Sequence, residues 1–370
     1  MSDIKICSYN CRGLGQFQKR RDVLNYLRRT NFQIFLLQDI HCHPSNTNRF
    51  RNLWGTDVLI AGYSNIARGV AILTKSIDIA FSDCHFDQGG NYIIVKATIN
   101  NSFTLIIANI YGPNVDDPEF FQQVGKICNE IRGSSNVPII LAGDFNVSIS
   151  QSLDTENYAR SNNPRNREEL IRLMSDLSVL DIFRERNPET RKFTWKVGCP
   201  PRKQARLDYF LVSDNIEPVI TETNILPPYR SDHAMVTIQL QISTGARGKG
   251  YYKFNASLLR DDLFIEKIKH CISKTLSIYA LPVYTPSFVA ENPESVDINI
   301  SWKAFWDTLI LSLRTEAISY SIFKNRERNK DENYLVKKIS ELHIIDQLSA
   351  EQHRELEKVG LEGFFSPLAS

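Results

Sequence analysis

The stretch that decides the fold runs from Pro138 to Ser148 and reads Pro-Ile-Ile-Leu-Ala-Gly-Asp-Phe-Asn-Val-Ser. Its apolar run, Ile139–Ala142, is typical of a buried strand. Asp144 and Asn146 follow at once, and the alternation of extended backbone directs both side chains to one face, opposite to Phe145. A carboxylate and a carboxamide at a strand end can hold a hydrated metal or a phosphate and orient a water molecule. They can also form an ordinary polar turn, so the other segments must decide.

Length and composition limit the class of protein. A chain of 370 residues is longer than one typical domain and suggests two. The net charge is only +2, so a nucleic-acid contact would depend on a local basic patch. The 7 cysteines are scattered without a Cys-x-x-Cys pair or zinc spacing, which predicts free thiols in a reducing compartment. No apolar run reaches membrane-spanning length and no apolar leader is present, so we expect a protein that is neither secreted nor membrane-bound.

The first part of the chain is rich in predicted strands. Two of them, Tyr92–Ile99 and Phe103–Ile110, are expected to form a hairpin across Asn100 and Asn101. The order of strands and helices favours an α/β sandwich in which two sheets face each other and helices lie outside. The remaining predicted strands are Ile4–Asn10, Ile34–Leu37, Val58–Ala61, Gly69–Leu73, Phe193–Lys196, Leu207–Val212, Val219–Ile225 and Ala234–Ile242, and the helices are Arg20–Arg29, Pro118–Arg132 and Arg165–Leu177.

The composition changes at Ser243–Gly250, which is rich in small and basic residues. We therefore predict a domain over residues 1–242, a linker over 243–252 and a mostly helical region over 253–370.

The helical region is expected to contain three helices, at Asp261–Leu276, Trp302–Tyr320 and Asn333–Leu348. The charge run Lys324–Lys330 is typical of a solvated helix face, and a nucleic-acid contact is the alternative interpretation. Large apolar side chains such as Trp306 cannot be buried by one helix alone, which indicates that this region packs against another structural element or another protein.

Polar side chains stand at the ends of several predicted strands in the first domain. If these ends meet at one rim, they supply what metal-assisted phosphodiester hydrolysis requires. Asp39 would hold Mg²⁺, which keeps most of its waters and takes few protein ligands. The residues at these ends are Asn10, Asp39, Tyr111, Asp144 with Asn146, and Asp208, together with the pair Asp232-His233 before the last strand.

Each of the other groups has a chemical role in such a site. Asp144 is the base that would orient the attacking water. His233, next to Asp232, would stay protonated and bind the phosphate oxygens, because a carboxylate partner favours imidazolium. Further hydrogen bonds to the oxyanion would come from Asn10, Asn146 and Tyr111.

Structural alternatives exist for these residues. Asn10 at a turn and Tyr111 before Gly-Pro can serve packing or capping alone. Asp208 lies inside an apolar strand, where a carboxylate without a partner is costly, and this favours a functional role. Asp232 and His233 could belong to a serine hydrolase, but no Gly-x-Ser-x-Gly elbow accompanies them.

Six segments, taken in order, resemble the motifs of the endonuclease/exonuclease/phosphatase superfamily, and most closely those of the endonuclease of LINE-type non-LTR retrotransposons. The resemblance covers about residues 1–242. It implies a four-layered α/β sandwich, dependence on Mg²⁺ with Mn²⁺ as a substitute, and nicking of DNA to leave a 3′-hydroxyl that primes reverse transcription. The segments are Ser8-Tyr9-Asn10-Cys11-Arg12-Gly13-Leu14, Leu37-Gln38-Asp39-Ile40-His41, Asn109-Ile110-Tyr111-Gly112-Pro113, Gly143-Asp144-Phe145-Asn146, Arg206-Leu207-Asp208-Tyr209 and Ser231-Asp232-His233.

The resemblance also implies a role for each matching residue. Asp39 is the implied metal ligand, with Asn10 and Asp232 beside it. The implied catalytic residues are Asp144 and Asn146 for the nucleophile, His233 with Asp232 for the phosphate, and Tyr111, Asn10 and Asp208 in support. One departure is Asp39 itself, because the family usually has Glu there and Asp reaches one methylene less far.

The predicted hairpin between Trp195 and Leu207 would, by the same resemblance, probe the minor groove of duplex DNA. The segment from residue 160 to 206 holds 12 Lys+Arg against 6 Asp+Glu, which makes a local basic patch, although a solvated loop is the alternative. The implied DNA-binding residues are Arg202, Lys203, Arg206, Thr194 and Ser231.

The tail after residue 250 resembles, more weakly, the helical connector that precedes reverse transcriptase in LINE polyproteins. No Tyr-x-Asp-Asp motif is present, so we expect a fragment or a truncated element. The expected partners are duplex DNA and the reverse transcriptase region of the same polyprotein, with no membrane, no small-molecule cofactor and a nuclear site of action. Alternative hypotheses are an abasic-site endonuclease or phosphatase on the same scaffold, or an inactive module that binds nucleic acid.

Overall fold

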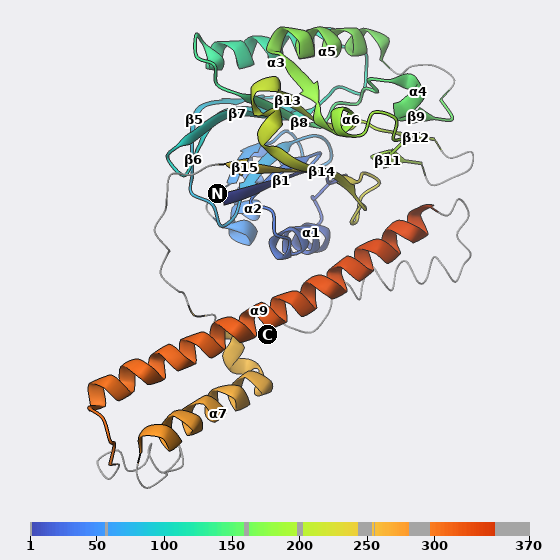
Figure 1. Cartoon of the computed structure of the whole chain (residues 1–370). Coiled ribbons are helices and arrows are strands. Elements are labelled where there is room, and N and C mark those ends of the chain that lie inside the picture. Colours follow the sequence, from blue (N-terminus) through green and yellow to red (C-terminus); the bar gives the residue numbers. More distant parts are fainter. Residues whose placement is uncertain are drawn as a thin grey trace. The chain divides into compact units, whose positions relative to one another are not determined.

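The computed structural model describes residues 2–55, 58–158, 163–197, 203–242, 254, 256–280 and 297–344 (Figure 1). The chain divides into two compact units, Met1–Ala246 and Arg247–Ser370. The predicted linker over 243–252 lies outside the described residues. Each unit is therefore considered by itself.

Two six-stranded sheets form the first unit. Strand β1 (Ser2–Asn10) lies inside the first sheet, where it pairs in parallel with β2 (Ile34–Gln38) and antiparallel with β15 (Met235–Ile242). The strand order is β14 (Ile220–Leu226), β15 (Met235–Ile242), β1 (Ser2–Asn10), β2 (Ile34–Gln38), β4 (Val70–Thr74) and β3 (Val58–Ala61).

Strand β8, the apolar run that decided the fold, lies inside the second sheet. It pairs in parallel with β7 and antiparallel with β13. The strand order is β10 (Val179–Asp181), β13 (Asp208–Ser213), β8 (Ile139–Asp144), β7 (Phe103–Tyr111), β6 (Tyr92–Ile99) and β5 (Ile79–Phe86). The predicted β6–β7 hairpin is confirmed, and its turn residues Asn100 and Asn101 both have positive φ, as Asn tolerates.

A small third sheet has the order β11 (Trp195–Lys196), β12 (Gln204–Ala205) and β9 (Thr155–Glu156). The helices of this unit are α1 (Phe17–Arg29), α2 (Asn48–Trp54), α3 (Pro118–Arg132), α4 (Gln151–Asp154), α5 (Pro164–Leu177) and α6 (Ile182–Arg186), with 3₁₀ turns η1 (Pro44–Asn46) and η2 (Asp214–Val219).

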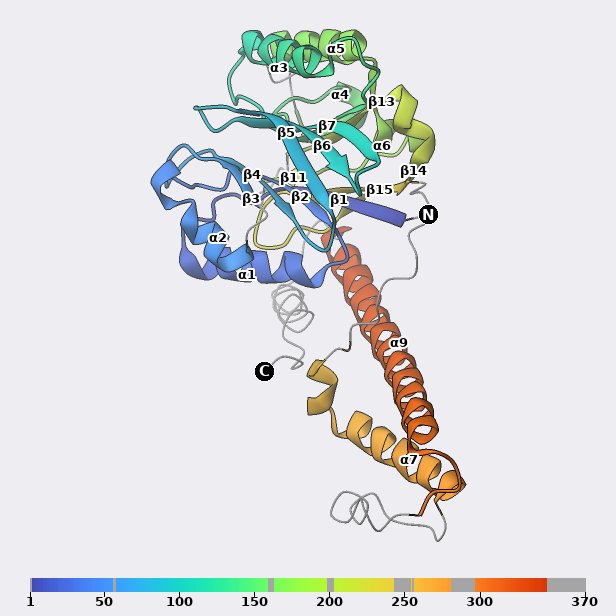
Figure 2. The same cartoon turned by 90° about the vertical axis from the view of Figure 1, so that its left-hand side faces the viewer.

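The two large sheets face each other across an apolar core, and helices cover their outer faces (Figure 2). Core side chains such as Ile6, Ile72 and Ile107 come from strands of both sheets. Helices α3 and α5 pack on the second sheet, and α1 and α2 pack on the first. The predicted four-layered α/β sandwich is therefore confirmed, and burial of its apolar strands supplies the main stabilising term.

The sandwich brings the ends of five strands together. In the second sheet Asp144 is the register partner of both Asp208 and Tyr111. In the first sheet Asn10 is level with Gln38, the last residue of β2. A hydrogen bond of 2.8 Å from Asn10 Nδ2 to Asp144 Oδ2 joins the two sheets at this rim.

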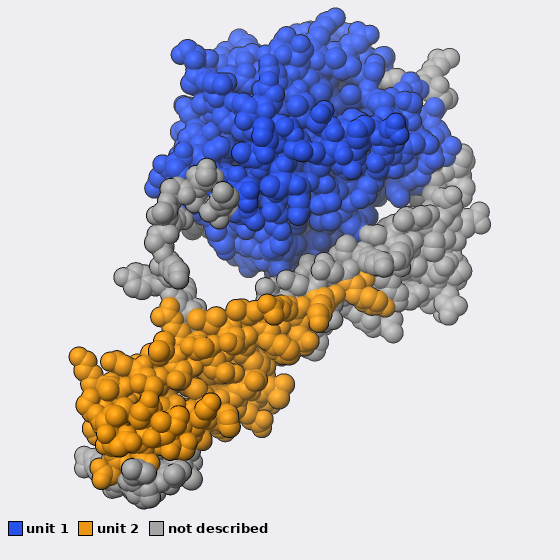
Figure 3. All heavy atoms as spheres, in the orientation of Figure 1, with its two compact units in different colours: residues 1–246 blue, residues 247–370 orange. Residues whose placement is uncertain are grey.

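The second unit, orange in Figure 3, holds helix α7 (Asp262–Tyr279), the 3₁₀ turn η3 (Ala256–Arg260) and helix α9 (Trp302–Ile344). Apolar side chains of α7 and α9, Leu276, Phe305 and Leu309 among them, pack together. Two separate helices were predicted at Trp302–Tyr320 and Asn333–Leu348. This was wrong, because one continuous helix runs from Trp302 to Ile344, the last described residue. Lys324 of the charge run lies 2.9 Å from the carboxylate of Asp261. Among the described residues, no helix is long and apolar enough to cross a membrane.

Candidate active site

The imidazole of His233 lies between two carboxylates of the second sheet. Its Nδ1 is 2.9 Å from Oδ2 of Asp208, and its Nε2 is 3.8 Å from Oδ2 of Asp144. All three side chains are buried, with exposures of 7% for His233, 2% for Asp208 and 1% for Asp144. A neutral imidazole can donate one hydrogen bond only, whereas imidazolium can face both carboxylates. The arrangement therefore favours the protonated form.

The electrostatics of this triad support the same protonation state. Burial alone would lower the pKa of His233, but Asp208 and Asp144 outweigh it and raise that pKa to about 9. Burial raises the pKa of Asp144 to about 7, although His233 acts in the opposite direction. A base whose pKa lies near the working pH is well matched to proton transfer.

Hydrogen bonds fix the carboxylate of Asp144 in one orientation. Asn10 Nδ2 donates to its Oδ2 at 2.8 Å, and the backbone N–H of Asn146 donates to its Oδ1 at 2.9 Å. Asn146 has a φ of +52° and donates from Nδ2 to the carbonyl of Gly112 at 2.8 Å. A Cβ on Gly112 would lie 2.2 Å from the carbonyl oxygen of Phe145, so only glycine fits this approach.

Tyr111 and Asp39 complete the group at the rim. The pKa of Tyr111 is raised by burial and then by the negative charges of Asp39 and Asp144. Asp39 follows β2 in a left-handed conformation with φ of +51°, which is uncommon outside glycine and is concentrated at functional sites. Its Oδ1 lies 3.0 Å from Nε2 of His41 and accepts a hydrogen bond of 3.1 Å from the backbone N–H of Arg68.

The donor set can be tested for a metal ion. Ligand atoms of Asp144, Asp208 and His233 all lie within 4.8 Å of one another, which is compatible with a metal site. A protonated His233 is no ligand, however, and Mg²⁺ prefers oxygen. In the described part of the chain, Oδ1 of Asp208 and Oδ1 of Asp232 are buried without a hydrogen-bond partner. The acidic cluster therefore fits a divalent cation through its carboxylates.

Asp232 and Ser231 hold the segment that carries His233. Oδ2 of Asp232 accepts a hydrogen bond of 3.2 Å from Nε1 of Trp195 and lies 3.2 Å from Nη1 of Arg12. The hydroxyl of Ser231 donates to the carbonyl of Asn10 at 2.7 Å. The roles of Asp232 and Asn10 as metal ligands stay predictions, and Ser231 makes a contact that positions its segment.

The predicted DNA-binding residues differ in their exposure to solvent. Lys203 is exposed, and Arg202 lies outside the described residues. Thr194 is buried, and its hydroxyl accepts from the backbone N–H groups of Leu207 and Asp208.

Arg206 requires a correction. It is 1% exposed, and its guanidinium pairs with the carboxylates of Asp154 and Asp181. Two carboxylates satisfy its charge inside the fold, so Arg206 is not available to a DNA phosphate in this structure.

Two residues near the site were not identified from the sequence. Arg12 has a left-handed backbone with φ of +47° and an exposed guanidinium beside Asp232. Trp195 forms an isolated β-bridge with His233. No local pattern of the sequence connects Arg12 to Asp232, or Trp195 to His233, because the partners are far apart along the chain.

The model of the Endonuclease/Exonuclease/phosphatase family matches residues 7–233, which include all the rim residues from Asn10 to His233. The chain belongs to this family. Nucleases and phosphatases of this family are hydrolases, and the acidic cluster of this chain fits a metal site.

Curated relatives of the chain point in the same direction. The chain is 25% identical over 276 residues to a "Transposon TX1 uncharacterized 149 kDa protein" of Xenopus laevis, covering 72% of this chain and 20% of that protein. It is 27% identical to "Recombination repair protein 1" of Drosophila melanogaster, covering 65% of this chain and 37% of the relative. An "Exodeoxyribonuclease" of Bacillus subtilis is 25% identical over 65% of this chain and 100% of its own length. The chain thus spans only a minor part of the first two relatives.

Solved structures share the fold. "AP endonuclease LMAP from Leishmania major" superposes with a TM-score of 0.56 at 16% identity, covering 65% of this chain and 88% of that one. The "3'-5' exonuclease (NExo) from Neisseria Meningitidis" gives a TM-score of 0.52 at 19% identity, covering 65% and 100%. A variant of the latter, described as a 3' phosphatase, is bound to a product DNA hairpin and gives a TM-score of 0.52 at 19% identity, covering 65% and 100%.

Proposed function

We propose that this protein is a divalent-metal-dependent DNA endonuclease of a retrotransposon, which nicks duplex DNA by phosphodiester hydrolysis and leaves a 3′-hydroxyl. The observation that carries the proposal is the meeting of Asp144, Asp208 and His233 within 4.8 Å at the strand ends. A buried base beside a buried cation suits attack of water on an anionic phosphate.

The residues divide the chemistry between them. Asp144 orients the attacking water and takes up its proton, because its pKa is raised toward neutrality while Asn10 and Asn146 hold its oxygens. Protonated His233 donates to a non-bridging phosphate oxygen, and Asp208 behind it keeps the ring charged and oriented. Tyr111, at the same rim, adds a hydroxyl donor toward the oxyanion.

Asp39 is the residue that would hold Mg²⁺ or Mn²⁺. Both of its contacts given above involve Oδ1, which leaves Oδ2 for a cation in the described site. A bound cation would neutralise negative charge on the phosphate and on the leaving oxygen. The family usually has Glu at this position, so the shorter Asp39 suits a metal held partly through water.

The retrotransposon assignment draws on the transposon relative. That protein is much longer than this chain, and we propose that the present chain corresponds to its nuclease part together with a helical connector. Nicking that leaves a 3′-hydroxyl would supply a primer end for reverse transcription. The proposed partners are therefore duplex DNA and a reverse transcriptase region, and the proposed place of action is the nucleus.

The test is nicking of supercoiled plasmid by the full chain in Mg²⁺. Asp144→Ala and His233→Ala are expected to slow the initial rate by roughly 10²–10⁴-fold, the usual loss for removal of an acid–base group. Asp176→Asn, on the exposed face of α5, is the matched control and should nick at the wild-type rate. Variants that nick as fast as the wild type would refute the proposal.

An abasic-site endonuclease or phosphatase is the second candidate, favoured by the described activities of the structural relatives. The same preparations can be given plain duplex, duplex with one abasic site, and a small phosphate ester. Faster cleavage of plain duplex supports the first proposal, whereas a strong preference for the abasic duplex or the ester supports the second. Tight DNA binding without metal-stimulated turnover would instead support an inactive binding module.

A further inference from the structure

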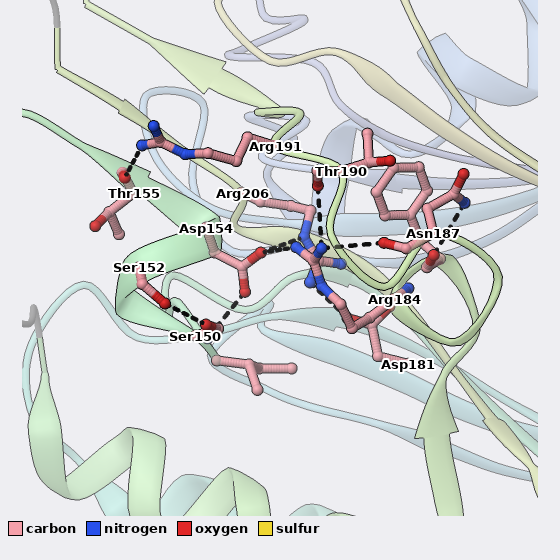
Figure 4. Close-up of polar contacts among 12 residues, drawn as sticks. Ser150, Ser152, Asp154, Thr155, Asp181, Arg184, Asn187, Thr190, Arg191 and Arg206 are labelled. Carbon is pink, nitrogen blue, oxygen red and sulfur yellow. Dashed lines mark hydrogen bonds and ion pairs between the residues drawn. The ribbon is translucent and has the colours of Figure 1, made fainter.

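A buried cluster of charged side chains lies beside the small third sheet, outside the site described above. Nε of Arg206 is 2.8 Å from Oδ1 of Asp154, and its Nη2 is 2.6 Å from Oδ2 of Asp181. Nη2 of Arg184 is 2.7 Å from the same oxygen of Asp154. Figure 4 shows the carboxylate of Asp154 pointing toward both guanidinium groups. Two carboxylates therefore meet two cations inside the fold.

The contacts hold Arg206 in one orientation. Its guanidinium packs over the rings of Tyr209 and Phe183, with 4.5 and 5.4 Å to the ring centroids. A planar fork held by two carboxylates and two rings has little freedom to turn. Since a buried ion pair adds little net stability over apolar side chains, fixing a geometry is a better reason for this cluster.

Arg206 joins the small sheet to the large one. It lies between β12 and β13, and its backbone N–H donates to the carbonyl of Asp154 at 2.8 Å. The hairpin of β11 and β12 ends just before Arg206, and Asp208 at the start of β13 follows two residues later. A change in the orientation of Arg206 would therefore displace both the hairpin and Asp208.

Thr194 connects the hairpin to the segments that carry Asp208 and His233. Its N–H donates to the carbonyl of Ala205 at 3.0 Å, and its carbonyl accepts from the N–H of Ala234 at 2.7 Å. Its hydroxyl accepts from the N–H of Asp208 at 3.1 Å. The hairpin is thereby tied to the segments on both sides of the His233–Asp208 pair.

The hairpin also presents positive charge at the edge of the site. Residues 191–205 contain no acidic side chain, and Arg191, Lys192 and Lys203 are exposed. Trp195 of the first hairpin strand donates to Asp232, the neighbour of His233. A DNA strand whose phosphate reaches His233 would pass this basic strand.

We propose that the contacts of Arg206 with Asp154 and Asp181 position the basic hairpin against the His233–Asp208 pair and thereby determine which phosphodiester of the DNA is cut. The inference rests on the proposed nuclease function and deepens it. Arg206 is a positioning residue, since it acts through the backbone around Ala205 and Thr194 without touching DNA.

The test uses Arg206→Lys and Asp181→Asn in the full chain. Nick positions are mapped on an end-labelled duplex of mixed sequence, and the ratio of cleavage at the two strongest sites is compared. That ratio does not depend on the fraction of folded enzyme, so a merely structural loss cannot change it. We expect a change of roughly tenfold for Arg206→Lys, because a misplacement of about 1 Å can cost up to about 10²-fold in rate. Asp181→Asn, which keeps Asp154, should change the ratio in the same direction by less.

Leu173→Ala is the matched control, because this residue is buried between α3 and α5 and its loss should lower stability without altering the ratio. Amide hydrogen exchange gives a readout that needs no activity: Arg206→Lys should accelerate exchange at Thr194, Asp208 and Ala234 relative to the amides of β1 and β2, whereas the control should accelerate both groups alike. Unchanged cleavage ratios in both variants overturn the proposal, whatever the exchange shows. A wild-type chain that never nicks overturns the proposed function and the choice of cut site with it. Unchanged exchange at the three amides overturns the positioning role.

Discussion

Replacing Asp144 by asparagine should make the protein more stable while it removes the catalytic base. The side chain is 1% exposed, and burial raises the pKa of its carboxyl from 3.8 to about 7. A group whose folded-state pKa is raised loses stability as the pH increases from its unfolded value through its folded value. At neutral and alkaline pH the folded protein therefore carries a buried charge that is missing from the Asp144→Asn variant.

The magnitude follows from the size of the shift. A difference of about 3 pKa units corresponds to about 4 kcal/mol at about 1.4 kcal/mol per unit. The attraction to protonated His233 is already contained in that shift. An asparagine side chain has one carbonyl oxygen for the two donors, Asn10 Nδ2 and the Asn146 N–H, and the lost hydrogen bond offsets part of the gain. We expect a net stabilisation of about 2–3 kcal/mol at pH 8, or roughly 5–10 °C in Tm for a unit of this size. At pH 5, where folded Asp144 is mostly protonated, the gain should fall to about 1 kcal/mol.

The assay is urea unfolding of the full chain in metal-free buffer at pH 5 and pH 8, followed by the fluorescence of the tryptophans. Asp176→Asn is the control, because its exposed carboxylate should change stability by less than about 0.5 kcal/mol at either pH. The reasoning is refuted if Asp144→Asn is no more stable than the wild type at pH 8. A gain of equal size at both pH values would also refute it.

The remaining predictions concern the metal, the DNA and the pH profile. Asp39→Glu should lower the Mg²⁺ concentration that gives half-maximal nicking, whereas Asp39→Ala should remove the Mg²⁺ response; equal Mg²⁺ titrations for both would contradict the assigned ligand. Arg12→Ala should raise KM for DNA and reduce the slope of log KM against log salt by about 1, because its exposed guanidinium would contact a phosphate; an unchanged slope would exclude that contact. The nicking rate should fall below about pH 7 as Asp144 takes up a proton and above about pH 9 as His233 loses one, and a flat rate from about pH 6 to 10 would contradict these roles.

The sequence predicted the sandwich because each buried strand carries its own local signal. The run before Asp144 is apolar throughout, and the two strands around Asn100 and Asn101 alternate and are joined by turn-forming residues. The site residues stand at the ends of such strands, and the resemblance of six ordered segments to one family implied that they belong to one site. The structure places Asn10 in hydrogen-bond contact with Asp144, as the predicted rim requires.

Other features depend on contacts distant in sequence and have no local signal. Arg206 looked like a surface cation, since nothing nearby indicates that Asp154 and Asp181 will meet it inside the fold. The same limitation applies to Arg12 beside Asp232. In the second unit, separate helices were predicted at Trp302–Tyr320 and Asn333–Leu348, although the charge run Lys324–Lys330 between them was interpreted as a solvated helix face. The helix is continuous there, and the Lys, Arg and Glu residues of the run are good helix formers.

The central claim is that these converging side chains hydrolyse a DNA phosphodiester on the side that leaves a free 3′-hydroxyl. The direct measurement gives Mg²⁺-nicked plasmid to a DNA polymerase with labelled nucleotides, without phosphatase treatment. The account predicts labelled extension from the nick with the wild-type chain and roughly 10²–10⁴-fold slower labelling with the His233→Ala protein. Breaks that can be extended only after phosphatase treatment, or equal extension with the His233→Ala protein, would contradict it.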